Sequence, residues 1–167
     1  LMISVIPTSA LADEAGEDTT TETTVATIGE NSYSTIAAAI EAAESGATIT
    51  VVADTAENIT VPEGTNITLA IQAGVTVSGG TTKDSADKSH TITNKGTLTI
   101  TGAGTLKNEN SGSGVLFNDV GATAELNGCT FTGTPWYVIK NLGDLTIDGA
   151  TVRQEDAGSS AIDNGWY

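Results

Sequence analysis

Basic residues and cysteines are scarce in this chain, and each scarcity excludes a class of protein or of bond. Six lysines and arginines stand against 21 aspartates and glutamates, so the net charge is −15. With so few cations, the chain has no basic patch for a phosphate backbone, and we expect no nucleic-acid partner. Cys129 is the single cysteine, so no disulfide can form within the chain. Its position after Gly128, at a predicted bend, indicates a small buried thiol.

Long apolar runs are also missing, and no stretch is long enough to span a membrane. Residues 1–12 are apolar and end in Ala10-Leu11-Ala12, a small-residue cleavage pattern that is followed by acidic residues. This arrangement is typical of the tail of a secretory signal peptide. We therefore expect a mature chain that is secreted or displayed on the cell surface, with no membrane insertion. Because the sequence begins at Leu1 instead of Met, we expect it to be a fragment.

The next two segments differ sharply in composition. Residues 13–24 are acidic and rich in threonine, with almost nothing to bury, which predicts a solvated linker. Residues 25–46 predict an N-terminal cap made of a short strand and a helix, with Ser34 as the N-cap and Gly46 as the C-terminal stop. The apolar face of this helix would contain Ile36, Ala39, Ile40 and Ala43. Such a helix can cover the exposed edge of a stack of strands.

What the chain does contain is a repeat of 23 or 24 residues. Four segments end in asparagine, at Asn94, Asn118, Asn141 and Asn164. A large aliphatic residue stands two positions before each one, at Ile92, Leu116, Ile139 and Ile162. A glycine-marked turn and an alternating strand follow the first three asparagines. A fixed period of this size predicts stacked units, each with about three short strands.

The repeat also predicts what lies inside. Alternation places the aliphatic residues in the interior, and stacking at about 4.8 Å would align them in columns. By the same parity Ile139 points inward and Lys140 outward. The asparagines would also be inside, at a bend, and buried amides must be hydrogen-bonded. We therefore predict that they bond to one another along the stack.

The period selects one architecture. Left-handed hexapeptide coils need about 18 residues per turn and propeller blades about 40, while a two-sheet sandwich would not hold a constant register. Residues 47–167 therefore predict an all-β solenoid, a right-handed parallel β-helix of about five turns. Its last turn stops at Trp166-Tyr167, so we expect the coil to be incomplete at its C-terminus.

The segment from Ile28-Gly29 through Tyr33 to Gly46 and the strand Ala47–Val51 resembles the start of many pectate-lyase-like, right-handed parallel β-helix modules. The resemblance covers residues 25–167. It implies a bacterial protein that is secreted or anchored at the surface. Its motifs are specific for the fold and not for an activity, since that superfamily includes lyases, glycoside hydrolases, adhesins and stalks.

These observations favour a structural or adhesin-like module that contacts a polysaccharide or a host or cell-wall glycan. The alternative is a polysaccharide lyase or glycoside hydrolase whose active site lies largely in a C-terminal part that is missing here. We assign no catalytic residue, metal or cofactor, and favour a module without enzymatic activity.

Two sets of residues are candidates for a site. The first is aromatic: Trp136 and Tyr137 are predicted in a loop before Val138, and Phe117 points outward by parity. Aromatic side chains exposed on neighbouring turns can stack on sugar rings. His90 opens a strand with no evident partner, and we expect it at the surface.

The second set is a patch of charged residues, Glu125, Asp144, Asp148 and Arg153. The resemblance implies that a lyase of that superfamily would use carboxylates for Ca²⁺ and a basic residue as proton acceptor. A hydrolase would need two facing carboxylates. We expect instead that this patch is a solvated acidic face.

Overall fold

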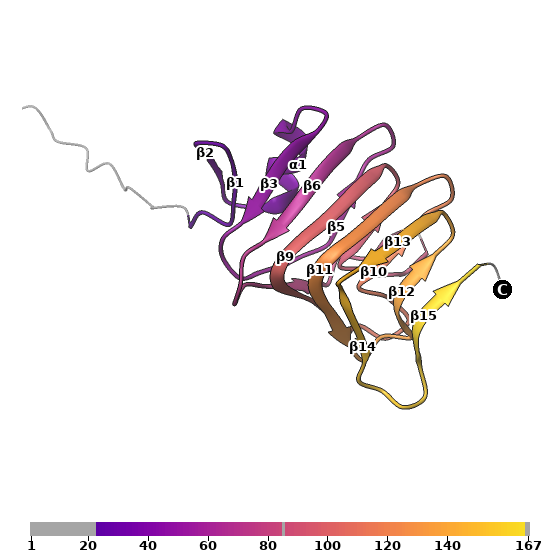
Figure 1. Cartoon of the computed structure of the whole chain (residues 1–167). Coiled ribbons are helices and arrows are strands. Elements are labelled where there is room, and N and C mark those ends of the chain that lie inside the picture. The colour runs from indigo at the N-terminus through magenta and orange to yellow at the C-terminus, as the bar shows by residue number, and fades with distance from the viewer. Residues whose placement is uncertain (1–22, 85, 166–167) are drawn as a thin grey trace, which may run out of the picture.

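The computed structural model describes residues 23–84 and 86–165. The predicted signal peptide and most of the predicted linker lie outside these residues. Figure 1 shows strands stacked side by side along a coil of about five turns, from the indigo N-terminal end to the yellow C-terminal end. The predicted all-β solenoid is confirmed, and the described residues contain one short helix near the N-terminus.

Each turn of the coil contributes to three faces. The first face contains β3 (Ala47–Val51), β6 (Asn66–Ile71), the first half of β9 (Thr97–Asn108), the first half of β11 (Thr123–Gly133) and β13 (Asp144–Asp148). The second contains β4 (Thr55–Glu57), β7 (Thr76–Gly79), the second halves of β9 and β11, and β14 (Thr151–Gln154). The third contains β5 (Ile59–Val61), β8 (Ile92–Asn94), β10 (Leu116–Asn118), β12 (Tyr137–Asn141) and β15 (Ser160–Asn164). Within each face the strands pair in parallel.

Strands β9 and β11 run through the bend between the first two faces without a break. Glycines stack at this bend: Gly102 and Gly128 both have φ of +106°. A Cβ on Gly102 would lie 2.1 Å from the carbonyl oxygen of Ile71, so only glycine fits there. Cys129 follows at φ +61° where the register shifts, because this single residue of β11 lies opposite two residues of β9, Ala103 and Gly104. Its thiol is buried as predicted. The Sγ atom donates to the carbonyl of Thr101 at 3.2 Å.

The predicted interior is confirmed for the inner turns. It was wrong for the last turn, where Ile162 is 42 % exposed and Asn164 is also exposed because no described residue covers them. Ile92, Leu116 and Ile139 pair in register and are fully buried. The asparagine ladder is present: Asn94 donates to Asn118 Oδ1 (2.8 Å), Asn118 to Asn141 Oδ1 (2.8 Å), and Asn141 to Asn164 Oδ1 (2.7 Å). Each of the three donors also bonds a carbonyl in the chain beside it, those of Thr123, Asp144 and Gly143. The ladder satisfies the buried amides that the bend creates.

A hairpin and a helix cover the N-terminal end. Strands β1 (Ala26–Ile28) and β2 (Asn31–Tyr33) pair antiparallel, and β1 pairs antiparallel with β3. Helix α1 (Ile36–Ala42) buries Ile36, Ala39 and Ile40.

The predicted helix limits were wrong. The N-cap is Thr35, whose Oγ1 accepts from the amide of Ala38 at 3.0 Å, and the C-cap is Ala43. Glu57 on β4 accepts from the amides of Ile36 and Ala37 (3.0 and 3.2 Å), which fixes where the helix begins.

The predicted exposure of Lys140 was also wrong. Parity does place it on the outer column of the third face, in register with Phe117 and Asp163. Its exposed fraction is nevertheless only 3 %. The ammonium group donates to Asp163 at 2.9 Å and to the carbonyl of Gly165 at 2.7 Å, so the last turn folds over it.

Candidate functional site

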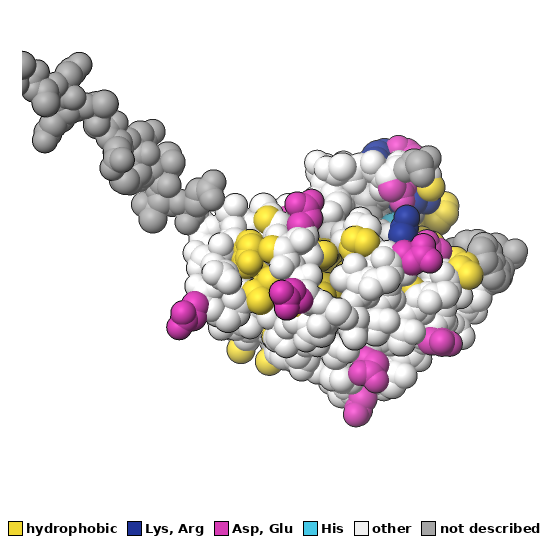
Figure 2. All heavy atoms as spheres, turned by 90° about the horizontal axis from the view of Figure 1, so that it is seen from above, with side chains coloured by type: hydrophobic (Ala, Val, Ile, Leu, Met, Phe, Trp, Pro, Cys, Tyr) yellow, Lys and Arg dark blue, Asp and Glu magenta, His cyan; other side chains and the backbone are white. Residues whose placement is uncertain are grey.

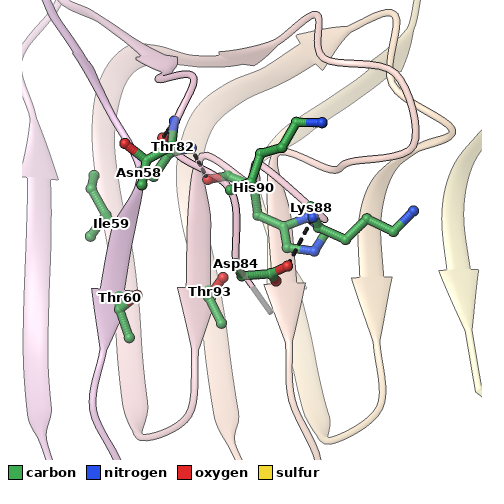
Figure 3. A pocket seen from close by; sticks show the side chains of 9 residues that line it. Asn58, Ile59, Thr60, Thr82, Asp84, Lys88, His90 and Thr93 are labelled. Atoms are coloured by element: carbon green, nitrogen blue, oxygen red, sulfur yellow. Dashed lines mark hydrogen bonds between the residues drawn. The ribbon is translucent and has the colours of Figure 1, made fainter. Parts of the chain in front are cut away.

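A groove lies on the third face, under the loop of residues 80–91 that connects β7 to β8. It consists of two adjoining cavities of about 210 and 400 Å³ that share five lining residues: Thr60, Asp84, Lys88, His90 and Thr93. The larger cavity is also lined by Ala86, Lys95, Phe117, Asp119 and Tyr137. Figure 3 shows the smaller cavity, with Asn58 and Thr60 on one strand region and His90 and Lys88 on the loop segment beside it.

Buried and half-buried amides anchor the loop over the third face. Asn58 donates to the carbonyl of His90 at 2.8 Å and accepts from the amide of Thr82 at 2.9 Å. Asn108 donates to the carbonyl of Ser89 at 2.8 Å. Within the loop, Asp84 Oδ1 accepts from the amides of Ala86 and Lys88, each at 2.8 Å. These bonds set the position of Lys88 and His90 relative to the strands below.

Three aromatic rings lie together in the larger cavity. The ring centroid of His90 is 5.0 Å from that of Phe117 and 6.2 Å from that of Tyr137, with interplanar angles of 17° and 28°. Gly114 stands between His90 and Tyr137 in the stack, and its missing side chain makes room: a Cβ there would lie 2.6 Å from Cε2 of Tyr137. Phe117 points outward as predicted. The rings of Phe117, His90 and Tyr137, with His90 stacked on both of the others, form an aromatic wall.

The imidazole of His90 is held in one form. Its Nδ1 accepts from the amide of Gly114 at 2.9 Å, so the proton of the neutral ring is on Nε2. Burial lowers the pKa of His90, and Lys88 also lowers it, whereas the carboxylate of Asp84 raises it. The prediction of a surface histidine was wrong, because the side chain is only 5 % exposed.

The polar lining has both donors and acceptors. Thr60, Thr93 and Phe117 pair in register, so two hydroxyls precede the phenyl ring in the outer column of the third face. The ammonium group of Lys88 lies 4.9 Å from the centroid of the Trp136 ring, a cation–π contact. Lys95 and the half-buried Asp119 complete the rim at the ends of β8 and β10.

The structure thus brings the aromatic candidates together, with differences in exposure. Trp136 is 60 % exposed, as a loop residue would be, whereas Tyr137 belongs to β12 and is only 7 % exposed. The prediction of Tyr137 in a loop was wrong, because its ring fills the space that Gly114 leaves. Sequence reasoning missed His90 and Lys88. A signal for His90 existed, since it stands two residues before Ile92, as Tyr137 does before Ile139.

The charged candidates lie on two different faces. Glu125 pairs in register with Thr99 and Thr146, and Asp144 and Asp148 bound β13 on the same first face. Arg153 is on β14, in the second face, where it aligns with Thr132 and through it with Lys107. Arg153 forms an ion pair with Glu155. Within residues 23–84 and 86–165, no three His, Cys, Asp or Glu side chains gather in a way that could hold a metal ion.

No family model, no curated protein and no solved structure matches this chain. In the part of the chain that the structure describes, no helix has the length and apolar character needed to cross a membrane.

Proposed function

We propose that this chain is a structural, adhesin-like β-helix module of a secreted or cell-surface protein, and that it contacts carbohydrate through the groove on its third face. The observation that carries this proposal is the aromatic wall of His90, Phe117 and Tyr137 beside polar groups that line the same cavity. The proposed location rests on the sequence of residues 1–12 and on the resemblance to β-helix modules.

The groove has the chemistry that a sugar requires. A pyranose ring has a face of C–H groups that packs on an aromatic ring, and an edge of hydroxyls that must be hydrogen-bonded. The half-buried ring of Phe117, which stacks on the buried His90, offers the first. The hydroxyls of Thr60 and Thr93 with the carboxylates of Asp84 and Asp119 offer the second. A volume of about 400 Å³ lies within the usual range of ligand pockets, roughly 300–1,000 Å³.

The framework suits a fixed contact surface. The wall residues belong to strands of neighbouring turns or to a loop that side-chain amides anchor, and the asparagine ladder joins the same turns. Little side-chain freedom remains to be lost on binding, so binding costs little ordering entropy.

Binding of the purified protein to a panel of neutral and acidic oligosaccharides tests the proposal. Phe117→Thr is the informative variant, because Thr60 and Thr93 already occupy the same column and the fold should be kept. We expect at least tenfold weaker binding, with an unchanged circular dichroism spectrum. The control is Val120→Thr, which changes an apolar side chain that is 57 % exposed outside the groove. Binding that is equally strong in both variants would contradict a site in the groove.

A further inference from the structure

The distribution of cations identifies one feature of the ligand, given the proposed saccharide-binding function. We infer that the ligand is a saccharide that ends in a single carboxylated sugar, whose carboxylate binds the ammonium groups of Lys88 and Lys95 while the sugar ring packs on the aromatic wall.

Four of the six basic residues have a carboxylate partner. Lys83 pairs with Asp87, Lys107 with Glu109, Lys140 with Asp163, and Arg153 with Glu155. Among the described residues, Lys88 and Lys95 have no carboxylate oxygen within the 4.0 Å of an ion pair, and both line the larger cavity of the groove. In a chain of net charge −15, the two cations without such a partner therefore share one site.

The two carboxylates of the cavity already accept hydrogen bonds from backbone amides. The two ammonium groups therefore remain available to a ligand. Asp84 accepts from two loop amides, and Asp119 accepts from the amide of Val120 at 2.8 Å. The ammonium group of Lys88 lies over the ring of Trp136. A π face attracts the charge of the ammonium group but does not accept its N–H groups as an oxygen atom would, so these donors can still bind a ligand. A carboxylate ligand would form charge-assisted hydrogen bonds to these donors.

The acidic surface around the groove favours one charge over many. Figure 2 shows the Lys and Arg side chains of this side gathered beside the histidine, with Asp and Glu side chains next to them and over the rest of the face. Charges interact over a Debye length of about 8 Å at physiological salt. A polyuronate would extend beyond the groove over like charges, whereas a saccharide with one terminal acid would not.

Three saccharides distinguish these possibilities in titration calorimetry: a disaccharide that ends in glucuronate, its neutral counterpart that ends in glucose, and polygalacturonate. We expect the acidic disaccharide to bind about tenfold more tightly than the neutral one, and polygalacturonate to bind more weakly per sugar than the acidic disaccharide. Lys88→Met and Lys95→Met should each bring the acidic disaccharide to within about threefold of the neutral one. The control Lys107→Met removes a lysine that is paired with Glu109 outside the groove, and it should keep the tenfold preference.

Each outcome is decisive. Equal binding of the two disaccharides to the unmodified protein, or a preference that both groove variants keep, would overturn the inference and leave the proposed saccharide site standing. Tighter binding of polygalacturonate would overturn the single-acid part. Phe117→Thr should weaken both disaccharides, and failure of all three saccharides to bind would instead overturn the proposed function for these sugars. Melting temperatures of the variants close to that of the unmodified protein establish that each one is folded.

Discussion

The two ends of the coil are built from the same kind of turn and have opposite surroundings. At the N-terminal end, α1 and the β1–β2 hairpin cover the first turn, and Ile49 and Val51 are fully buried. At the C-terminal end, nothing in the described residues covers β13 and β15, and Ile147 and Ile162 are 38 % and 42 % exposed. Figure 1 shows the helix beside the indigo end and bare strands at the yellow end.

The difference shows that burial in this fold is set by neighbouring turns. Ile162 aligns with Ile139, which is fully buried, and Ile147 aligns with Leu126, which is also fully buried. In each pair both residues are large aliphatic residues at the same position of the turn. They differ in whether a further turn covers them. Stability should therefore depend on contacts between adjacent turns, as in other repeat proteins. The same substitution at an inner turn and at the last turn tests this dependence.

The largest effect is expected for a charge in the aliphatic column. Ile139→Asp buries an unpaired carboxylate between two turns and should lower the free energy of unfolding by more than about 4 kcal/mol. Ile162→Asp, at the open end, should cost less than about 1 kcal/mol, as exposed sites do. Urea denaturation followed by circular dichroism measures both. Similar losses in the two variants would show that covering turns do not set the cost.

The asparagine ladder should show the same contrast at a smaller scale. In Asn118→Leu, Asn94 loses its acceptor and Asn141 loses its donor, so we expect a loss of about 1–3 kcal/mol. Asn164→Leu removes one bond only, at an exposed position, and should cost less than half as much. If chemical denaturation gives equal values, the ladder does not stabilise the inner turns more than the end.

At the covered end, Glu57 should matter mainly to the helix, although its carboxylate also accepts from the Thr55 hydroxyl at 2.8 Å. Glu57→Gln removes the charge of the carboxylate that accepts hydrogen bonds from two backbone amides at the start of α1. We expect a loss of about 1 kcal/mol of local stability. Hydrogen exchange should be faster in α1 and unchanged in β13–β15. The matched control is Glu41→Gln, an exposed residue of the same helix, for which exchange should not change.

The smallest expected effect is a pH dependence of the free energy of unfolding, which His90 in the middle of the coil should cause. His90 is the single histidine of the chain, and burial lowers its pKa in the folded state. In the unfolded chain its pKa is about 6.5, so below that pH the unfolded state binds a proton that the folded state does not. Stability should therefore be complete above about pH 7 and should fall toward pH 5. His90→Gln should flatten this part of the dependence; an identical slope in the variant would assign it to the carboxylates.

Sequence reasoning was most successful where a residue's surroundings repeat. The register of Asn94, Asn118 and Asn141 follows from a constant period, because stacking brings equal positions together. The column of Thr99, Glu125 and Thr146 follows in the same way. Each of these contacts depends on one number, the length of a turn.

Sequence reasoning failed where a contact is made at one place only and does not recur from turn to turn. The helix begins after Thr35 because Glu57, on a strand of the first turn, accepts its first amides. Lys140 is buried because the last turn supplies Asp163 and a backbone carbonyl. Neither contact leaves a local pattern.

The groove was predictable in part. Parity correctly identified Phe117 as outward, whereas Tyr137 was predicted in a loop and belongs to β12. The stacking of His90 with both rings depends on the absent side chain of Gly114 and on the course of the loop above. The position of Lys88 depends on the same loop, whose path the alternating pattern does not determine.

The central claim is that the third face, and not the open end, is the contact surface for a saccharide. The most direct test is the change in backbone amide chemical shifts of the ¹⁵N-labelled protein as the glucuronate-terminated disaccharide is added. We predict that the largest changes occur at Thr60, His90, Thr93 and Phe117, and that Ile147 and Ile162 remain unchanged. Largest changes in β13 and β15, or around Glu125 on the first face, would contradict the account.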